Sequence, residues 1–269
     1  MDIFKAIVLG IIQGATEFLP VSSSGNLVIY PAIFKWGTPT LSFVMALHMG
    51  TFFAVLFYYI KDVWRLILAF FNTFKKRKTK EEKAYVRLFW MLFIALIPAG
   101  IVGVLFADKI GDVFSEPHIV SIFLFITAGI LILSSIDFRK QWDKIENIRL
   151  KHALSVGFIQ IAALFPGISR SGSTIAGGVF SGLNREDAAR FSFLLSIPTI
   201  GGAGLLEIKS ALNSSISNVS HAALFWGFIA SFVVGFLSIG FFFRIIKKTK
   251  FYYFAIYCII LGLIGLIFA

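Results

Sequence analysis

Charged side chains are scarce in this sequence. Lys, Arg, Asp and Glu make up 14% of the 269 residues, whereas a soluble domain carries about 25%. Hydrophobic residues make up 58%, and the mean hydropathy is +0.86. This composition excludes a water-facing globular protein and predicts a chain that crosses a membrane several times.

Cysteine is almost absent, and acidic residues are few. Cys258 is the only cysteine, which excludes a disulfide framework and a cysteine-based metal site. The 14 acidic residues face 25 basic ones, for a net charge of +11. The basic residues gather in short segments between apolar runs, as in cytoplasmic loops of membrane proteins. We therefore expect the lipid bilayer, and no nucleic acid, as a partner.

Two common phosphate-binding signatures are also missing. The sequence contains no Gly-x-x-x-x-Gly-Lys-Ser/Thr motif, which excludes the usual nucleotide-binding loop. Its four histidines, at positions 48, 118, 152 and 221, do not occur in a Pro-Ser-Gly-His setting. This excludes the acid phosphatases that form a phosphohistidine.

Apolar runs long enough to cross a bilayer, about 20 residues each, recur along the chain. We predict six full spans, at residues 41–60, 88–106, 119–136, 188–206, 222–243 and 251–268. Two further apolar stretches, 1–34 and 152–182, are interrupted near their middle by Gly, Ser and Pro. Broken backbone at membrane depth needs cover from protein or a cavity, so we interpret both stretches as re-entrant helix–turn–helix segments.

The basic segments predict the topology. Residues 61–87, 137–151 and 244–250 are rich in Lys and Arg and should be cytoplasmic, while 107–118 and 207–221 hold one lysine each and should be external. These sides agree only if 152–182 enters and leaves on the same face.

The resulting fold class is an all-α polytopic membrane protein with two inverted-topology repeats. Each repeat has a re-entrant broken helix followed by three transmembrane helices. The first repeat is 1–136, the second is 152–269, and 137–151 is a cytoplasmic linker. In such folds the working site usually lies where the two broken segments meet.

The second broken segment carries a motif suited to phosphate, Pro166-Gly-Ile-Ser-Arg-Ser-Gly-Ser-Thr174. The guanidinium of Arg170 can hold phosphate oxygens with a planar fork, and four hydroxyls surround it. These candidate phosphate-binding residues are Ser169, Ser171, Ser173 and Thr174. Close helix packing alone would explain the small residues but not a charge within an apolar stretch.

The first broken segment carries a carboxylate and a run of serines. Gln13 and Glu17 are four residues apart and share one helix face. Glu17 could bind a divalent cation, take a proton or pair with Arg170. Ser22, Ser23 and Ser24 lie in the break, where one could act as a nucleophile. The alternative is that Glu17 only pairs with Arg170 and the serines satisfy the broken backbone.

These motifs, with Gly182-Leu-Asn-Arg-Glu-Asp-Ala-Ala-Arg-Phe-Ser-Phe-Leu-Leu-Ser-Ile-Pro198, resemble the signatures of the undecaprenyl-diphosphate phosphatase family of the bacitracin-resistance type. The resemblance implies a multi-pass inner-membrane enzyme that hydrolyses a polyprenyl diphosphate lipid to its monophosphate. This would recycle the carrier for peptidoglycan synthesis and confer bacitracin resistance. It also implies a divalent cation, magnesium or calcium, as cofactor.

The resemblance assigns roles to individual residues. Glu17 is the acidic catalytic residue and a metal ligand, Ser23 a nucleophile or activating hydroxyl, and Arg170 the phosphate clamp. The remaining candidates for substrate or phosphate binding are Gln13, Ser22, Ser24, Asn26, Ser169, Ser171, Ser173 and Thr174.

One position departs from the family pattern. Asn26 stands where the family usually has His, and an amide can orient a phosphate but cannot transfer a proton at neutral pH. His48, in the middle of the predicted span 41–60, is a candidate acid or base in its place. The alternative is that His48 is a hydrogen-bonded packing residue.

Inverted repeats with broken helices are also a transporter architecture. The alternative function is therefore a flippase for polyprenyl phosphate with the same fold. The sequence leaves both a monomer and a homodimer open.

The predicted topology can be tested by labelling. Cysteines introduced at Asn72 and Ser214 should react with impermeant reagents from opposite sides of the membrane, because the first lies in a basic connection and the second in a lysine-poor one. Labelling of both from the same side would contradict the inverted-repeat topology.

Overall fold

The computed structural model describes residues 2–106, 116–136, 142–212, 220–246 and 250–269. Within these ranges the chain forms eleven α-helices and one 3₁₀ turn, η1. The elements are α1 (Ile3–Phe18), α2 (Ser23–Ile33), α3 (Leu41–Tyr58), α4 (Ile60–Asn72), α5 (Lys80–Leu105), α7 (Pro117–Ser134), η1 (Ile145–Asn147), α8 (Leu150–Ala162), α9 (Arg170–Ser181), α10 (Arg185–Leu212), α11 (His221–Ile245) and α12 (Tyr252–Phe268).

Five of these helices are long and apolar enough to cross a membrane: α3, α5, α7, α10 and α11. Helix α12 is equally apolar but has 17 residues. The prediction of an all-helical, multi-pass membrane protein is therefore confirmed. Helix α4 was not predicted, and it lies almost entirely in the basic segment 61–87. Ser214 and most of the two connections predicted to be external lie outside the described residues.

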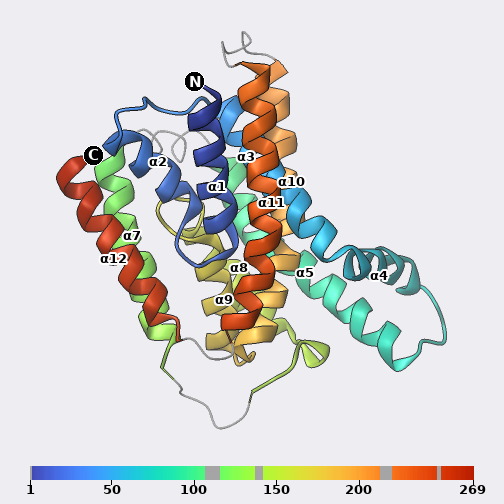
Figure 1. The fold of residues 1–269 in the computed structure, drawn as a ribbon. Helices are drawn as coiled ribbons and strands as arrows, with labels where there is room; N and C mark the ends of the chain where they lie inside the picture. Colours follow the sequence, from blue (N-terminus) through green and yellow to red (C-terminus); the bar gives the residue numbers. More distant parts are fainter. Residues whose placement is uncertain (1, 107–115, 137–141, 213–219, 247–249) are drawn as a thin grey trace.

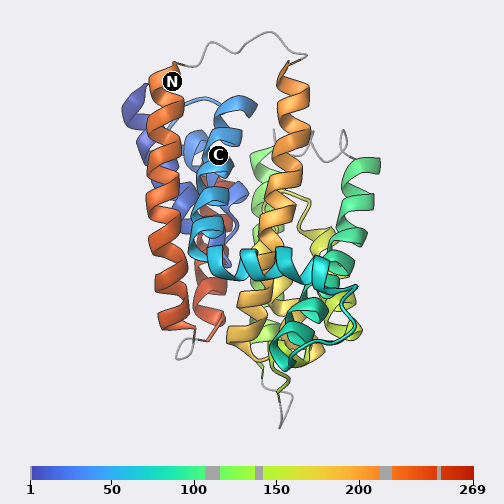
Figure 2. The ribbon, with the colours of Figure 1, turned by 90° about the vertical axis from the view of Figure 1, so that its right-hand side faces the viewer.

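The long helices stand side by side, and α4 with the first turns of α5 projects from the bundle (Figures 1 and 2). Helix α11 packs against α1 and α3, while α12 packs against α7. The projecting arm is tied back by Asp62 of α4, which accepts hydrogen bonds from Arg190 of α10 at 2.6 Å and Tyr85 of α5 at 2.7 Å.

Helix α1 lies unusually close to α11 because glycine faces the contact. A Cβ atom on Gly14 would come within 2.7 Å of the Ser231 carbonyl oxygen and the Gly235 nitrogen. Small residues allow this backbone approach in membranes. Across the same contact, Ser238 donates a hydrogen bond to the Ala15 carbonyl at 3.1 Å. The contact fixes the end of α1 that carries Glu17.

Both stretches predicted to be broken consist of two helices joined by a short turn. The first break, between α1 and α2, contains Pro20 and places Ser22 in the left-handed region at φ 62°. The second break, between α8 and α9, contains Pro166 and Gly167 at φ 95°. Glycine adopts that angle without steric cost, whereas a serine there is strained.

Candidate active site

The two helix breaks meet inside the bundle. Ser24, in the first turn of α2, accepts a hydrogen bond from the backbone N–H of Gly167 at 3.4 Å. In return, Ser171 of α9 donates to the Leu19 carbonyl at 2.9 Å. These bonds join segments about half the chain apart and bring the two sequence motifs into one polar cluster.

A buried ion pair stands at the centre of this cluster. Nη2 of Arg170 lies 2.6 Å from Oε1 of Glu17, and the Glu17 side chain is 6% exposed. The other carboxylate oxygen, Oε2, accepts from Ser23 Oγ at 2.5 Å and from Gln13 Nε2 at 2.9 Å. The structure thus brings together Glu17, Ser23, Arg170 and Gln13.

Several buried polar atoms of the cluster have no partner among the described residues. They are Nη1 of Arg170, Oε1 of Gln13 and Oγ of Ser173. A buried polar group without a hydrogen bond is costly, and such groups in a native protein often await a ligand. The Arg170 nitrogen is a charged donor suited to an anionic oxygen.

The N-termini of two helices lie at the junction of the two breaks. Helix α2 begins at Ser23 and α9 at Arg170. Their capping residues are Ser22 and Ser169, whose hydroxyls accept hydrogen bonds from the third N–H along, at 3.2 Å and 3.0 Å. The positive ends of both helix dipoles therefore favour an anion at the junction.

The other hydroxyls predicted to bind phosphate form hydrogen bonds or close contacts within the two breaks and the helices that follow them. Thr174 donates to the Arg170 carbonyl at 2.8 Å and lies 2.6 Å from the Ser192 hydroxyl. The hydroxyls of Ser22 and Ser24 are 3.3 Å apart, and those of Ser169 and Ser171 are 3.2 Å apart.

Asn26 is fully buried, and its amide is committed to protein groups. Its Nδ2 donates to the carbonyls of Val21 at 3.0 Å and Ser22 at 2.7 Å, and its Oδ1 accepts a short hydrogen bond from Tyr257. These bonds hold Ser22 in its left-handed conformation. Binding phosphate through Asn26 would require the amide to give up one of them.

His48 of α3 lies beside the cluster and is half-buried. Its Nδ1 is 2.9 Å from the Val44 carbonyl, and the residue is close enough to Glu17 for an electrostatic interaction. An imidazole that donates from Nδ1 keeps Nε2 as an acceptor. No hydrogen bond joins His48 to Glu17, Ser23 or Arg170 among the described residues.

The cluster offers few ligands for a divalent cation. Within the described part of the chain, no three His, Cys, Asp or Glu side chains form a metal-binding group. Magnesium often binds through one or two carboxylates and takes its other ligands from substrate phosphates and water. Glu17 and the unpartnered Oε1 of Gln13 fit a cation of that kind.

Two residues on other helices, neither of them predicted from the sequence, support the breaks. Thr127 of α7 donates to the Gly167 carbonyl at 2.8 Å and accepts from the Ser169 N–H at 3.0 Å. Tyr257 of α12 binds Asn26. A lone hydroxyl within an apolar span was the only signal in the sequence, and it does not identify a partner.

Comparison with known proteins gives a consistent assignment. Residues 6–264 match the family model described as "Bacitracin resistance protein BacA". A protein of Geotalea daltonii is 39% identical over 100% of this chain and 98% of its own length. One from Methanosphaera stadtmanae is 42% identical over 99% of this chain and 98% of its own length. Both carry the name undecaprenyl-diphosphatase.

The support that Tyr257 gives to the first break can be measured as stability. Replacing Tyr257 with Phe removes the donor to Asn26, and a hydrogen bond of this kind contributes about 0.5–1.5 kcal/mol. Unfolding of the purified protein in detergent should therefore occur at a lower temperature. Tyr253→Phe is the matched control, since Tyr253 lies on an exposed part of the same helix; an equal effect of both variants would contradict this role.

Proposed function

The chain belongs to the bacitracin resistance protein BacA family and is an undecaprenyl-diphosphatase, and from this premise we propose that hydrolysis takes place where the two helix breaks meet. The reaction converts undecaprenyl diphosphate to undecaprenyl phosphate and inorganic phosphate. It recycles the lipid carrier of cell-wall synthesis, and bacitracin resistance follows from the family.

The observation that carries the site assignment is the Glu17–Arg170 pair with its unused donor. Arg170 presents one nitrogen to Glu17 and leaves buried Nη1 without a partner. A terminal phosphate placed at the two helix N-termini would accept from that nitrogen and from the hydroxyl of Ser173. Charged hydrogen bonds at such a site can stabilise the extra charge of the transition state.

Glu17 is the proton acceptor in this proposal. Its Oε2 already accepts the hydrogen bond of Ser23 at 2.5 Å, which is within reach for general-base catalysis. In one route Ser23 Oγ attacks the terminal phosphorus and gives its proton to Glu17, while the phosphoanhydride bond breaks and undecaprenyl phosphate leaves. Water then hydrolyses the phosphoserine. In the other route Glu17 activates water, which attacks phosphorus directly.

Further candidates complete the proposed site. Glu17 and Gln13 would hold a divalent cation, magnesium or calcium, which would neutralise phosphate charge when bound. The Nε2 atom of His48 is a candidate proton acceptor or donor. Asn26 acts by holding the turn that presents Ser23, consistent with its three hydrogen bonds.

We also propose that the chain is an inverted duplication in the cell inner membrane. Repeat 1–136 would contain the α1–α2 break followed by α3, α5 and α7. Repeat 152–269 would contain the α8–α9 break followed by α10, α11 and α12, with 137–151 as the cytoplasmic linker. Apart from α4, which has no counterpart in the second half, the helix order of the two halves is the same, and this order and the meeting of the two breaks support the arrangement.

Phosphate release tests the proposed chemistry. The purified protein should release inorganic phosphate from undecaprenyl diphosphate, and a chelator should suppress release until magnesium or calcium is restored. If the wild type releases none while Asn26→His does, the chain has lost its hydrolytic chemistry. The flippase alternative would then become the better interpretation.

Arg170→Lys tests the geometry of the phosphate clamp. Lysine keeps the positive charge but loses the planar fork, and a hydrogen bond to a charged group is worth about 1.5–3 kcal/mol. We expect kcat/KM for phosphate release to fall by about tenfold or more. Arg87→Lys, at an exposed position of α5, is the control, and near-wild-type turnover of Arg170→Lys would refute the clamp.

A further inference from the structure

Gln160 is a buried polar side chain of α8 that the proposed chemistry does not use. It is 2% exposed, and neither its Oε1 nor its Nε2 has a hydrogen-bond partner among the described residues. An amide buried without hydrogen bonds is costly, and buried polar groups in native proteins rarely lack a partner. The amide therefore indicates a partner from outside the chain, which is either a ligand or a water molecule.

The sequence before Gln160 repeats the pattern of the first break, with one difference. A glycine stands three residues before Gln13 and three residues before Gln160. Gln13 donates a hydrogen bond to Glu17, four residues further along the same helix face. The residue four positions after Gln160 is Leu164, which cannot accept a hydrogen bond. The second glutamine thus keeps its amide in an apolar helix without a carboxylate to bind.

The contact between α8 and α9 places Gln160 opposite the first turn of α9. A Cβ atom on Gly177 would lie 3.0 Å from the Cα atom of Val156, and Ser155 donates to the Gly177 carbonyl at 2.8 Å. This contact joins the middle of both helices across the break, so the helices run antiparallel. One turn nearer the break, the facing residues are Gln160 on α8 and Ser173 on α9. The buried hydroxyl of Ser173 also has no partner among the described residues.

We propose that Gln160 binds the terminal phosphate of the substrate, together with Ser173 and Nη1 of Arg170. The latter two residues are three apart in the first turn of α9 and share one helix face. Phosphate oxygens accept hydrogen bonds, and Nε2 of Gln160, the Ser173 hydroxyl and the guanidinium are donors. Oε1 of Gln160 then accepts from a water molecule, which is the second reactant in hydrolysis. This proposal rests on the proposed function, because its ligand is the substrate phosphate.

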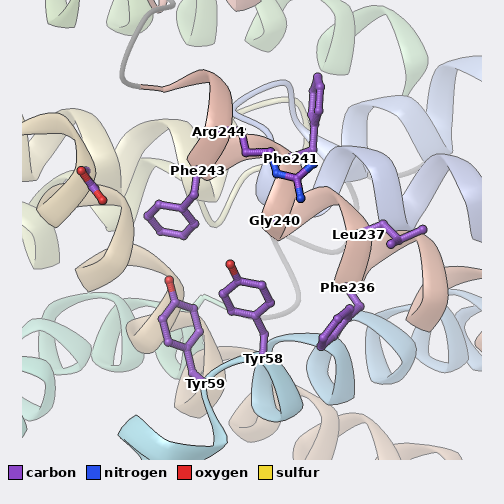
Figure 3. Close-up of a pocket in the computed structure, with 9 residues that line it drawn as sticks. Tyr58, Tyr59, Phe236, Leu237, Gly240, Phe241, Phe243 and Arg244 are labelled. Atoms are coloured by element: carbon purple, nitrogen blue, oxygen red, sulfur yellow. The ribbon is translucent and has the colours of Figure 1, made fainter.

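A pocket of about 790 Å³ elsewhere in the bundle offers a control position. The described residues that line it belong to the end of α3, the first turn of α10 and the second half of α11 (Figure 3). Tyr58 is one of them, and its ring packs against Phe236 with centroids 5.5 Å apart. Tyr58→Phe removes one hydroxyl there and should change neither phosphate release nor the unfolding temperature.

Gln160→Met tests the proposal, because methionine has a similar length but lacks both polar atoms. The unfolding temperature of the purified full chain in detergent should not fall, since no described group loses a hydrogen bond. The kcat/KM for phosphate release from undecaprenyl diphosphate should fall about tenfold or more, since a hydrogen bond to a charged phosphate is lost. Ser155→Ala, on the same helix, should show the reverse pattern, because its hydroxyl binds a protein carbonyl.

A second measurement does not depend on turnover. Methylenediphosphonate, a non-hydrolysable diphosphate analogue, should raise the unfolding temperature of the wild type, and Gln160→Met should need about tenfold more of it for the same rise. If the wild type releases no phosphate, the proposed function fails, and this shift still tests Gln160. Equal shifts in both proteins, or an unchanged kcat/KM, would overturn the proposal. A lower unfolding temperature in both Gln160→Met and Gln160→Leu would also overturn it, because the amide would then have a partner within the protein.

Discussion

The ion pair between Glu17 and Arg170 is the interaction on which the arrangement of the two halves depends. Each charge lies in a broken apolar segment, where an unpaired charge costs several kcal/mol. Each charge is neutralised by the other, at 2.6 Å across a sequence separation of 153 residues. Removing one partner of a buried pair typically costs about 3–5 kcal/mol of stability. The two breaks must therefore lie next to each other, because any arrangement that separates them leaves both charges unpaired.

The breaks themselves are stable because other helices satisfy their backbone groups. Hydrocarbon offers no hydrogen bonds, so every carbonyl and N–H freed by a break needs a protein partner. Asn26 supplies two donors to the first break, and Thr127 supplies both a donor and an acceptor to the second. The site is thus held by α7 and α12 as well as by its own segments, which allows Ser22 to keep a strained conformation.

In the proposed mechanism, the same arrangement would allow a site at membrane depth to receive a highly charged diphosphate. Two helix N-termini and one arginine provide positive potential, while Glu17 prevents Arg170 from being left unpaired before the substrate binds. The substrate phosphate would, in this proposal, bind the unpartnered Nη1 of Arg170 without breaking that pair. Glu17 would then remain hydrogen-bonded to Ser23, as the proposed general base.

The sequence alone determined the class of protein, because apolar runs of membrane length, two interruptions and two opposite intramembrane charges are local patterns with a direct physical cost. It also indicated that Gln13 and Glu17 share a helix face, since helical periodicity requires it. Only the tertiary structure decided that the Asn26 amide is hydrogen-bonded to the turn and to Tyr257, and that Thr127 supports the second break. Each depends on a contact between helices far apart in the chain, such as the one joining residues 26 and 257. A single polar residue in an apolar span does not indicate which helix it will face.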